Sequence, residues 1–197
     1  MKKAILILFL ALCSKSTFAQ KPCDKDPIYN QFDYWVGEWE VYDLKGNVAG
    51  QSKISKILDN CVVLEEWTSN GAQQGLIFSG KSFNSYNATT KQWQQNWVDN
   101  TGGSNEYLTG FFEKDAMHFK SRPFTNNGKT SIRTITFFKL ADGKVRQLGE
   151  ISNDDGKTWT TESHFQTQSI TSRQSNWFYS EGAASFKNFI PNLLDLN

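Results

Sequence analysis

From Gly37 to residue 168 the sequence repeats one pattern, a strand-like run of residues followed by a cluster of turn-forming residues. The clusters recur every ten to fifteen residues and are rich in Asn, Asp and Gly, which reverse the chain between paired strands. Nine clusters separate ten predicted strands, and no long 3.6-residue periodicity interrupts them. The predicted strands cover residues 37–44, 48–58, 61–68, 74–86, 91–99, 105–113, 116–122, 130–140, 144–152 and 158–168.

Short links between these runs predict that each strand pairs with the next in an antiparallel meander. An open sheet of this size would expose two unpaired edges, which promote aggregation unless the outer strands pair with each other. The sequence therefore predicts an all-β fold, an antiparallel meander of about ten strands closed into a barrel. A two-sheet sandwich is the structural alternative.

The N-terminus predicts an exported protein. Lys2 and Lys3 precede the short apolar run 4–12, and Thr17-Phe18-Ala19 resembles a signal-peptide cleavage site, so the mature chain should begin at Gln20. The expected location is periplasmic or extracellular. A lipid anchor on Cys13 is the alternative, although Leu12 stands where that signal requires a small residue.

Charge and cysteine content limit the possible partners. Removal of residues 1–19 takes away Lys2, Lys3 and Lys15, so the net charge changes from +1 to −2, and no basic block remains to bind nucleic acid. No further run is apolar enough to span a membrane. The two cysteines of the mature chain, Cys23 and Cys61, predict a disulfide, since an even pair in an exported protein favours one.

The chain divides into a signal peptide (1–19), an N-terminal tail with a helical turn (20–36), a barrel domain (37–168) and a C-terminal extension (169–197). In the tail, Asp26 is placed to cap a short helical turn, with Pro27 in its first position. In the extension, residues 183–196 predict a short amphipathic helix interrupted by Pro191.

Residues 152–159 match the Asp-box pattern Ser-x-Asp-x-Gly-x-Thr-Trp, which sialidase propellers repeat several times. The pattern stabilises a hairpin turn: Asp154 accepts backbone N–H bonds, Gly156 supplies a positive φ, and Trp159 is expected to be buried at the start of the next strand. A single copy in a chain with too few strands for a propeller indicates a structural role.

The two histidines, His118 and His164, are the obvious candidates for metal or haem ligation. Neither lies in a closely spaced group of His, Cys and carboxylate residues, so we expect solvated strand histidines, no metal and no cofactor. The sequence also lacks a serine nucleophile elbow and a phosphate-binding glycine loop.

Polar and aromatic residues alternate where a packed core would be aliphatic. With a period of two, residues 65 and 67 share one strand face, as do 82, 84 and 86, then 93, 95, 97 and 99, and finally 146 and 150. If these faces point inward, the barrel encloses a polar-aromatic cavity for a small molecule. Exterior cross-strand ladders are the alternative. The candidate ligand-binding residues are Glu65, Trp67, Asn84, Tyr86, Trp93, Gln95, Trp97, Arg146 and Glu150.

Several blocks together resemble a family of bacterial, often exported, lipocalin-like proteins whose function is not established. The blocks are residues 32–41, which include the Gly37-x-Trp39 opening of calycin barrels, and residues 57–67, 80–86, 93–99 and 145–159. The resemblance implies a calycin-type barrel and transfers no catalytic residue. Gly149 departs from it, because a large aromatic is expected there; glycine would enlarge a cavity or mark a bulge.

The sequence thus favours an exported barrel that binds a small, largely apolar ligand, with Arg146 as a partner for a ligand carboxylate. Two other hypotheses remain open. One is an enzyme that uses a buried Glu65 or Glu150 as a general base on a hydrophobic substrate. The other is an envelope interaction module whose barrel interior is filled. Neither a partner protein nor an oligomeric state follows from the sequence.

Overall fold

The computed structural model describes residues 22–73, 75–126 and 128–170, and it confirms the predicted all-β fold. The signal peptide, the predicted cleavage site and the C-terminal helix lie outside these residues. The strands closely follow the predicted ranges: β1 Gly37–Tyr42, β2 Val48–Ile57, β3 Val62–Gln73, β4 Leu76–Asn87, β5 Gln92–Asp99, β6 Ser104–Glu113, β7 Ala116–Ser121, β8 Phe124–Asn126, β9 Lys129–Lys139, β10 Val145–Ser152 and β11 Thr160–Ser169.

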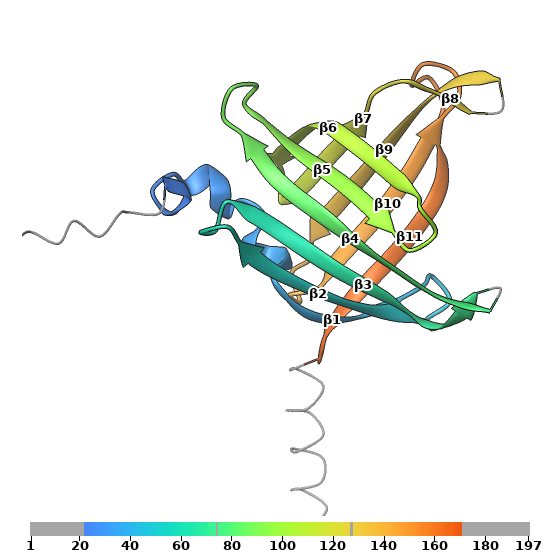
Figure 1. Ribbon diagram of the computed structural model, residues 1–197, viewed down its shortest axis with the longest axis horizontal. Coiled ribbons are helices and arrows are strands. Elements are labelled where there is room, and N and C mark those ends of the chain that lie inside the picture. Colours follow the sequence, from blue (N-terminus) through green and yellow to red (C-terminus); the bar gives the residue numbers. More distant parts are fainter. Residues whose placement is uncertain (1–21, 74, 127, 171–197) are drawn as a thin grey trace, which may run out of the picture.

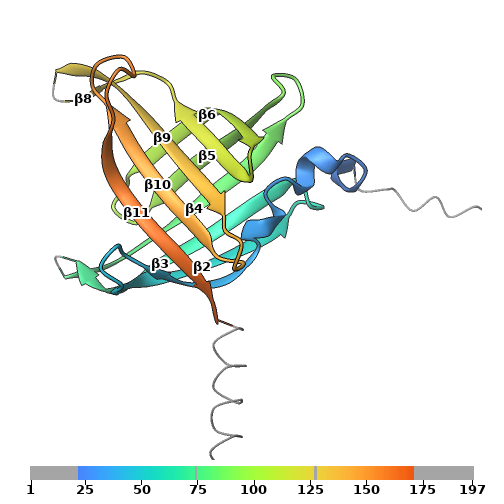
Figure 2. The same ribbon diagram turned by 180° about the vertical axis from the view of Figure 1, so that it is seen from behind.

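Ten of these strands form a closed antiparallel barrel. Each pairs with the next in sequence order, except that β7 pairs with β9, and β11 returns to pair with β1. The closing register places Trp39 opposite Ser169. The short β8 is an addition that pairs with β9 alone. Figures 1 and 2 show the barrel from opposite sides, with the blue N-terminal segment at one end. The ring of pairings excludes the sandwich.

The N-terminal segment forms three short 3₁₀ turns, η1 Pro22–Asp24, η2 Pro27–Asn30 and η3 Asp33–Trp35. The cap of η2 is the predicted one: Pro27 begins the turn, and the Asp26 carboxylate accepts the Ile28 N–H at 3.0 Å. These turns bring two aromatic residues, Phe32 and Trp35, into one end of the barrel.

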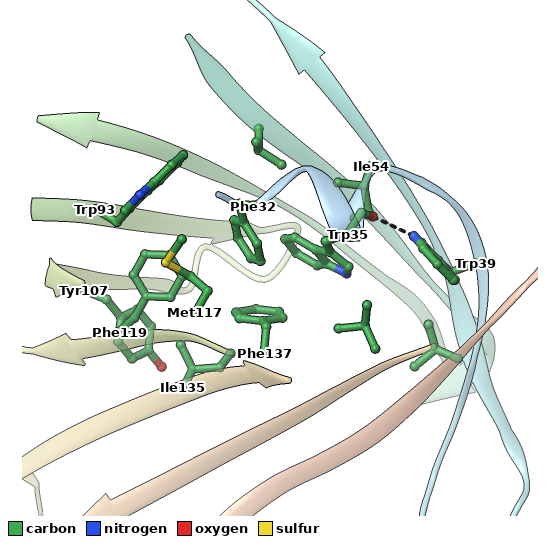
Figure 3. Close-up of a cluster of buried hydrophobic side chains, with 13 residues drawn as sticks. Phe32, Trp35, Trp39, Ile54, Trp93, Tyr107, Met117, Phe119, Ile135 and Phe137 are labelled. Carbon is green, nitrogen blue, oxygen red and sulfur yellow. Dashed lines mark hydrogen bonds between the residues drawn. The ribbon is translucent and has the colours of Figure 1, made fainter. Parts of the chain in front are cut away.

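Phe32 and Trp35 plug that end. Their rings stack with centroids 4.9 Å apart, and both are almost fully buried. The Phe137 ring of β9 lies 4.5 Å from Trp35 and 5.2 Å from Phe32. Behind the plug, the Trp39 indole N–H donates to the Trp35 carbonyl at 2.8 Å, the dashed contact in Figure 3. Gly37, at φ +150°, turns the chain into β1.

Three polar anchors fasten the plug to the barrel wall. The Lys56 ammonium of β2 pairs with the Asp33 carboxylate at 2.9 Å and donates to Asn30 at 2.9 Å. The Tyr34 hydroxyl donates to the Phe137 carbonyl at 2.7 Å and accepts the Met117 N–H at 3.2 Å. The Trp93 indole N–H of β5 donates to the Gln31 side chain at 3.0 Å. The plug is therefore joined to four strands.

The predicted disulfide is present. Cys23 of η1 is bonded to Cys61, which immediately precedes β3, and the two Cα atoms lie 5.2 Å apart. The bond closes a chain separation of 38 residues, which on the chain-entropy account stabilises the fold by about 3–4 kcal/mol. It ties the beginning of the described chain to the β2–β3 turn at the plugged end.

Candidate functional site

A cavity of about 460 Å³ lies inside the barrel, with Trp35 of the plug in its wall. Its volume is within the range of small-molecule sites, roughly 300–1,000 Å³. Seven aromatic residues supply the apolar surface: Trp35, Trp67, Phe78, Trp97, Tyr107, Phe137 and Phe165. The remaining lining residues are Val41, Ala49, Ser52, Glu65, Gln95, Asn105, Ile135, Gln147, Ser163 and Thr167.

Among the described residues that line this cavity, Glu65 of β3 is the one acidic residue, and it is buried. The Ser52 hydroxyl of β2 donates to its Oε1 and the Ser82 hydroxyl of β4 donates to its Oε2, each at 2.9 Å. Cross-strand pairing explains the contact with Ser82, because Glu65 and Ser82 lie directly opposite each other. The carboxylate is thus held between hydroxyls from both neighbouring strands.

A chain of amides supports this arrangement. Gln95 of β5 donates to the Asn84 carbonyl oxygen at 2.7 Å, and the Asn84 amide donates to Ser82 Oγ at 3.0 Å. Because Ser82 accepts from Asn84, its own proton is directed to Glu65. A second Asn84 proton goes to the Val63 carbonyl at 3.0 Å. Both protons of the Asn84 amide are therefore used within the barrel wall, and Glu65 is the final acceptor in this series of hydrogen bonds.

Burial raises the pKa of Glu65 to about 7, and the hydrogen bonds from Ser82 and Ser52 lower it only in part. No Lys, Arg or His belongs to the described residues that line this cavity. The carboxylate is therefore hydrogen-bonded but has no positive partner in the cavity wall. Near neutral pH this group is therefore partly protonated and partly ionised, which suits a general base or a proton-linked binding group.

Two glycines allow two tryptophans to lie flat against the wall. A Cβ on Gly80 of β4 would overlap the Trp97 ring, and a Cβ on Gly50 of β2 would overlap the Thr68 carbonyl oxygen and lie 2.7 Å from the Trp67 ring. The Trp97 indole N–H is held by Asp99 Oδ2 at 3.2 Å. Both indoles occupy space that a side chain would otherwise fill, so the cavity stays open between them.

The structure brings four of the nine candidate ligand-binding residues to the cavity wall: Glu65, Trp67, Gln95 and Trp97. Asn84 is fully buried behind Ser82, in the amide chain. Trp93 and Tyr86 lie at the plugged end, where their rings are 6.0 Å apart and Trp93 packs against Phe32 at 6.2 Å. Trp93 and Tyr86 therefore pack against the plug at the end of the barrel and do not line the cavity.

Arg146 and Glu150 of β10 are not brought to the cavity. The buried positions of this strand include Val145, Gly149 and Ile151, and Gln147 lines the cavity, so residues 146 and 150 belong to the other face. The Arg146 guanidinium lies over the Phe138 ring at 4.2 Å. The inward orientation expected for these two residues is therefore incorrect, and Arg146 cannot meet a ligand inside the barrel.

Most of the aromatic residues of the cavity wall were not identified from the sequence, nor was Ser52, one of the two serines that donate to Glu65. Ser52 lies between Gly50 and Ile54 at a spacing of two, and this small-polar alternation was a usable signal. Tyr107, Phe137 and Phe165 carry no signal of their own, since an aromatic residue in a strand usually indicates ordinary core packing. At the departure noted in the sequence, Gly149, the pairing with β11 is bulged, and a Cβ there would overlap the Ser163 hydroxyl.

The Asp box forms the β10–β11 turn as expected. Asp154 accepts the Thr158 N–H at 2.8 Å and the Thr158 hydroxyl at 2.6 Å, while Ser152 accepts the Gly156 N–H at 2.8 Å. The bonds from Thr158 and Ser152 lower the pKa of Asp154 to about 2. Gly156 has φ +85°. The expected burial of Trp159 is wrong: it is 37% exposed and lies near Gly156 of the turn.

The described residues show no group of three or more His, Cys, Asp or Glu side chains that could hold a metal ion. His118 points away from the buried Met117 and Phe119 and stacks on Phe111 with ring centroids 5.0 Å apart. His164 occupies the strand position between two lining residues, Ser163 and Phe165.

Among the described helical segments, none has the length and apolar content needed to cross a membrane.

Fold and cavity together define a closed antiparallel β-barrel with a polar-aromatic cavity in its interior, an architecture compatible with lipocalin-like proteins. Comparison with known proteins finds neither a protein family nor a curated protein that matches this chain.

Proposed function

We propose that this protein is an exported, lipocalin-like barrel that binds a small, largely apolar ligand in its interior. One observation carries the proposal, the 460 Å³ cavity with seven aromatic residues around a buried carboxylate. A barrel interior that served stability alone would be close-packed with side chains and would leave no cavity of this size. Here two glycines leave room for an open space whose wall combines aromatic rings with Glu65 and several uncharged polar side chains, a mixture that suits a small-molecule site.

The proposed location is supported by the disulfide, which suits an oxidising compartment, and by the signal-peptide pattern of the sequence. Intact mass of the mature protein tests the location directly: the chain should begin at Gln20, whereas an acylated chain that begins at Cys13 would replace this proposal with a lipid anchor.

A neutral fluorescent probe, N-phenyl-1-naphthylamine, tests the binding proposal. It should bind saturably to one site and change tryptophan emission. Trp97→Ala, which removes part of the cavity wall, should weaken binding by about tenfold, the effect of losing roughly 1.4 kcal/mol of contact. Trp159→Ala is the matched control, because Trp159 is exposed beside the Asp-box turn. Equal effects of the two substitutions, or no saturable binding, would contradict the proposal and favour the interaction module.

A second candidate, an enzyme with Glu65 as general base, is favoured by the raised pKa of that carboxyl group, about 7. Its binding requirement is the same, so the two candidates differ only in turnover. Glu65→Gln should abolish conversion of a bound substrate while leaving its affinity within a few-fold if this candidate is correct. Glu150, the other proposed base, belongs to the opposite face of β10 from the cavity.

A further inference from the structure

The cavity has an electrostatic bias that its shape alone does not reveal. Its lining residues in the described chain include one carboxylate, that of Glu65, and no Lys, Arg or His. Arg133 donates to the lining residue Asn105 at 3.2 Å, but its guanidinium is already paired with Glu162 by bonds of 2.7 and 3.0 Å. A ligand carboxylate would therefore meet a negative group and no available cation.

The donors around Glu65 also limit what a ligand can offer. Each carboxylate oxygen accepts one serine proton, and an ionised carboxylate provides about four acceptor sites, so acceptor capacity remains on both oxygens. Ser82 and Asn84 have their protons committed within the wall. A ligand group that meets the ionised Glu65 carboxylate must consequently bring protons of its own.

We infer, on the basis of the binding function proposed above, that the ligand is a lipophilic amine whose protonated nitrogen donates to Glu65. The apolar body would lie among the aromatic residues, and the indoles of Trp67 and Trp97 border the same space. Aromatic faces attract a cation in a desolvated site, and charge-assisted hydrogen bonds to a carboxylate exceed neutral ones in strength. A positive nitrogen supplies the partner that the buried carboxylate lacks in the wall.

Proton linkage gives this inference a second signature. The pKa of Glu65 is about 7, so at lower pH an amine must displace a proton from the carboxyl group before it can pair with the carboxylate. Affinity should fall by about tenfold for each pH unit below that value and reach a plateau above it.

The groups that face Glu65 should not contribute to the pH dependence of amine affinity. Those from β2, β4 and β5 are Ser52, Ser82 and Gln95, which do not titrate in this range. Tyr107 is the other titratable residue among the described residues of the lining, and burial raises the pKa of its phenol above the ordinary value, so it remains neutral. The Arg133–Glu162 pair is already joined outside the lining. Lys53, Glu66 and Lys81 form exposed ion-pair contacts on the outer face.

Displacement of the neutral naphthylamine probe by three eight-carbon compounds tests the inference. Octylamine should bind at least about tenfold more tightly than 1-octanol near pH 8, and octanoate should bind more weakly than either. Glu65→Gln should reduce the preference for the amine over the alcohol to within a few-fold and remove the pH dependence. If that variant folds poorly, the competition series and the pH profile of the wild-type protein still test the inference.

The outcomes separate this inference from the binding proposal. If the probe binds and octanoate or octanol competes as well as octylamine, the amine assignment is wrong and the ligand-binding barrel stands. If amine affinity is flat between about pH 5 and pH 8, Glu65 is not the partner of the nitrogen. If no compound, including the neutral probe, binds saturably, both the inference and the proposed function fail.

Discussion

The indole ring of Trp97 occupies the position that a side chain on Gly80 would need. The two residues belong to the neighbouring strands β4 and β5, and a Cβ built on Gly80 overlaps the Trp97 ring. The same ring borders the cavity. Glycine here leaves room for a large ring to lie along the wall, and the open volume of the site depends on that arrangement.

Gly80→Ala should therefore push the Trp97 ring from the wall toward the interior and reduce binding of the neutral probe by about tenfold or more. Stability should fall by roughly 1–3 kcal/mol, as expected of an overpacked core. Probe titration and urea denaturation measure the two effects. Gly71→Ala is the matched control, because a Cβ there meets nothing within 4 Å and should leave binding unchanged. Unchanged binding in both variants would contradict the role assigned to Gly80.

Glu65 should make the protein less stable as the pH rises. Its pKa is about 7 in the folded chain, above the ordinary 4.5, so between these values the folded protein holds a proton that the unfolded chain has released. The free energy of unfolding should decrease by up to about 3 kcal/mol from pH 4.5 to pH 7 and then remain constant with respect to this group. Urea denaturation of the wild type and Glu65→Gln measures the difference; parallel profiles would show that Glu65 is not responsible.

Loss of the disulfide should destabilise the protein without changing its fold. Cys61→Ser frees the η1 segment from the β2–β3 turn and should lower the free energy of unfolding by about 3–4 kcal/mol, as expected for a loop of this length. Chemical denaturation with and without a reductant measures the effect: reduction should affect the wild type and not the variant. Two free thiols in the untreated, denatured mature protein would contradict the bond itself.

Asp154→Ala should lower the melting temperature and leave the affinity for the neutral probe unchanged, because its carboxylate bonds only within the Asp-box turn. The pKa of this group is lowered to about 2 from 3.8, so its stabilising effect is complete above the ordinary value and declines as the pH falls toward 2. The difference in melting temperature between wild type and variant should thus shrink under strong acid. Loss of binding at an unchanged melting temperature would show instead that the turn belongs to the ligand site.

The fold was predictable because its signals are local. Turn residues set the strand ends, and alternation set the faces of β3, β4 and β5. The orientation of β10 was not predictable in this way, because Val145 and Ile151 lie on one face and Leu148 on the other, so both faces contain apolar residues. The Glu65 network depends on strand register, and the fully buried plug depends on how the 3₁₀ turns enter the barrel. Neither feature can be predicted from the local sequence of one segment.

The pairing of β1 with β11 has a kinetic consequence. It joins residues as far apart as Trp39 and Ser169, a separation of 130 positions (169 − 39), and contacts of such long range form slowly. The enclosed space exists only after this seam has formed, so a ligand has nothing to bind while the chain is still assembling. We therefore expect bound ligand to leave the refolding rate unchanged and to prolong the lifetime of the native protein, by delaying the opening of the seam.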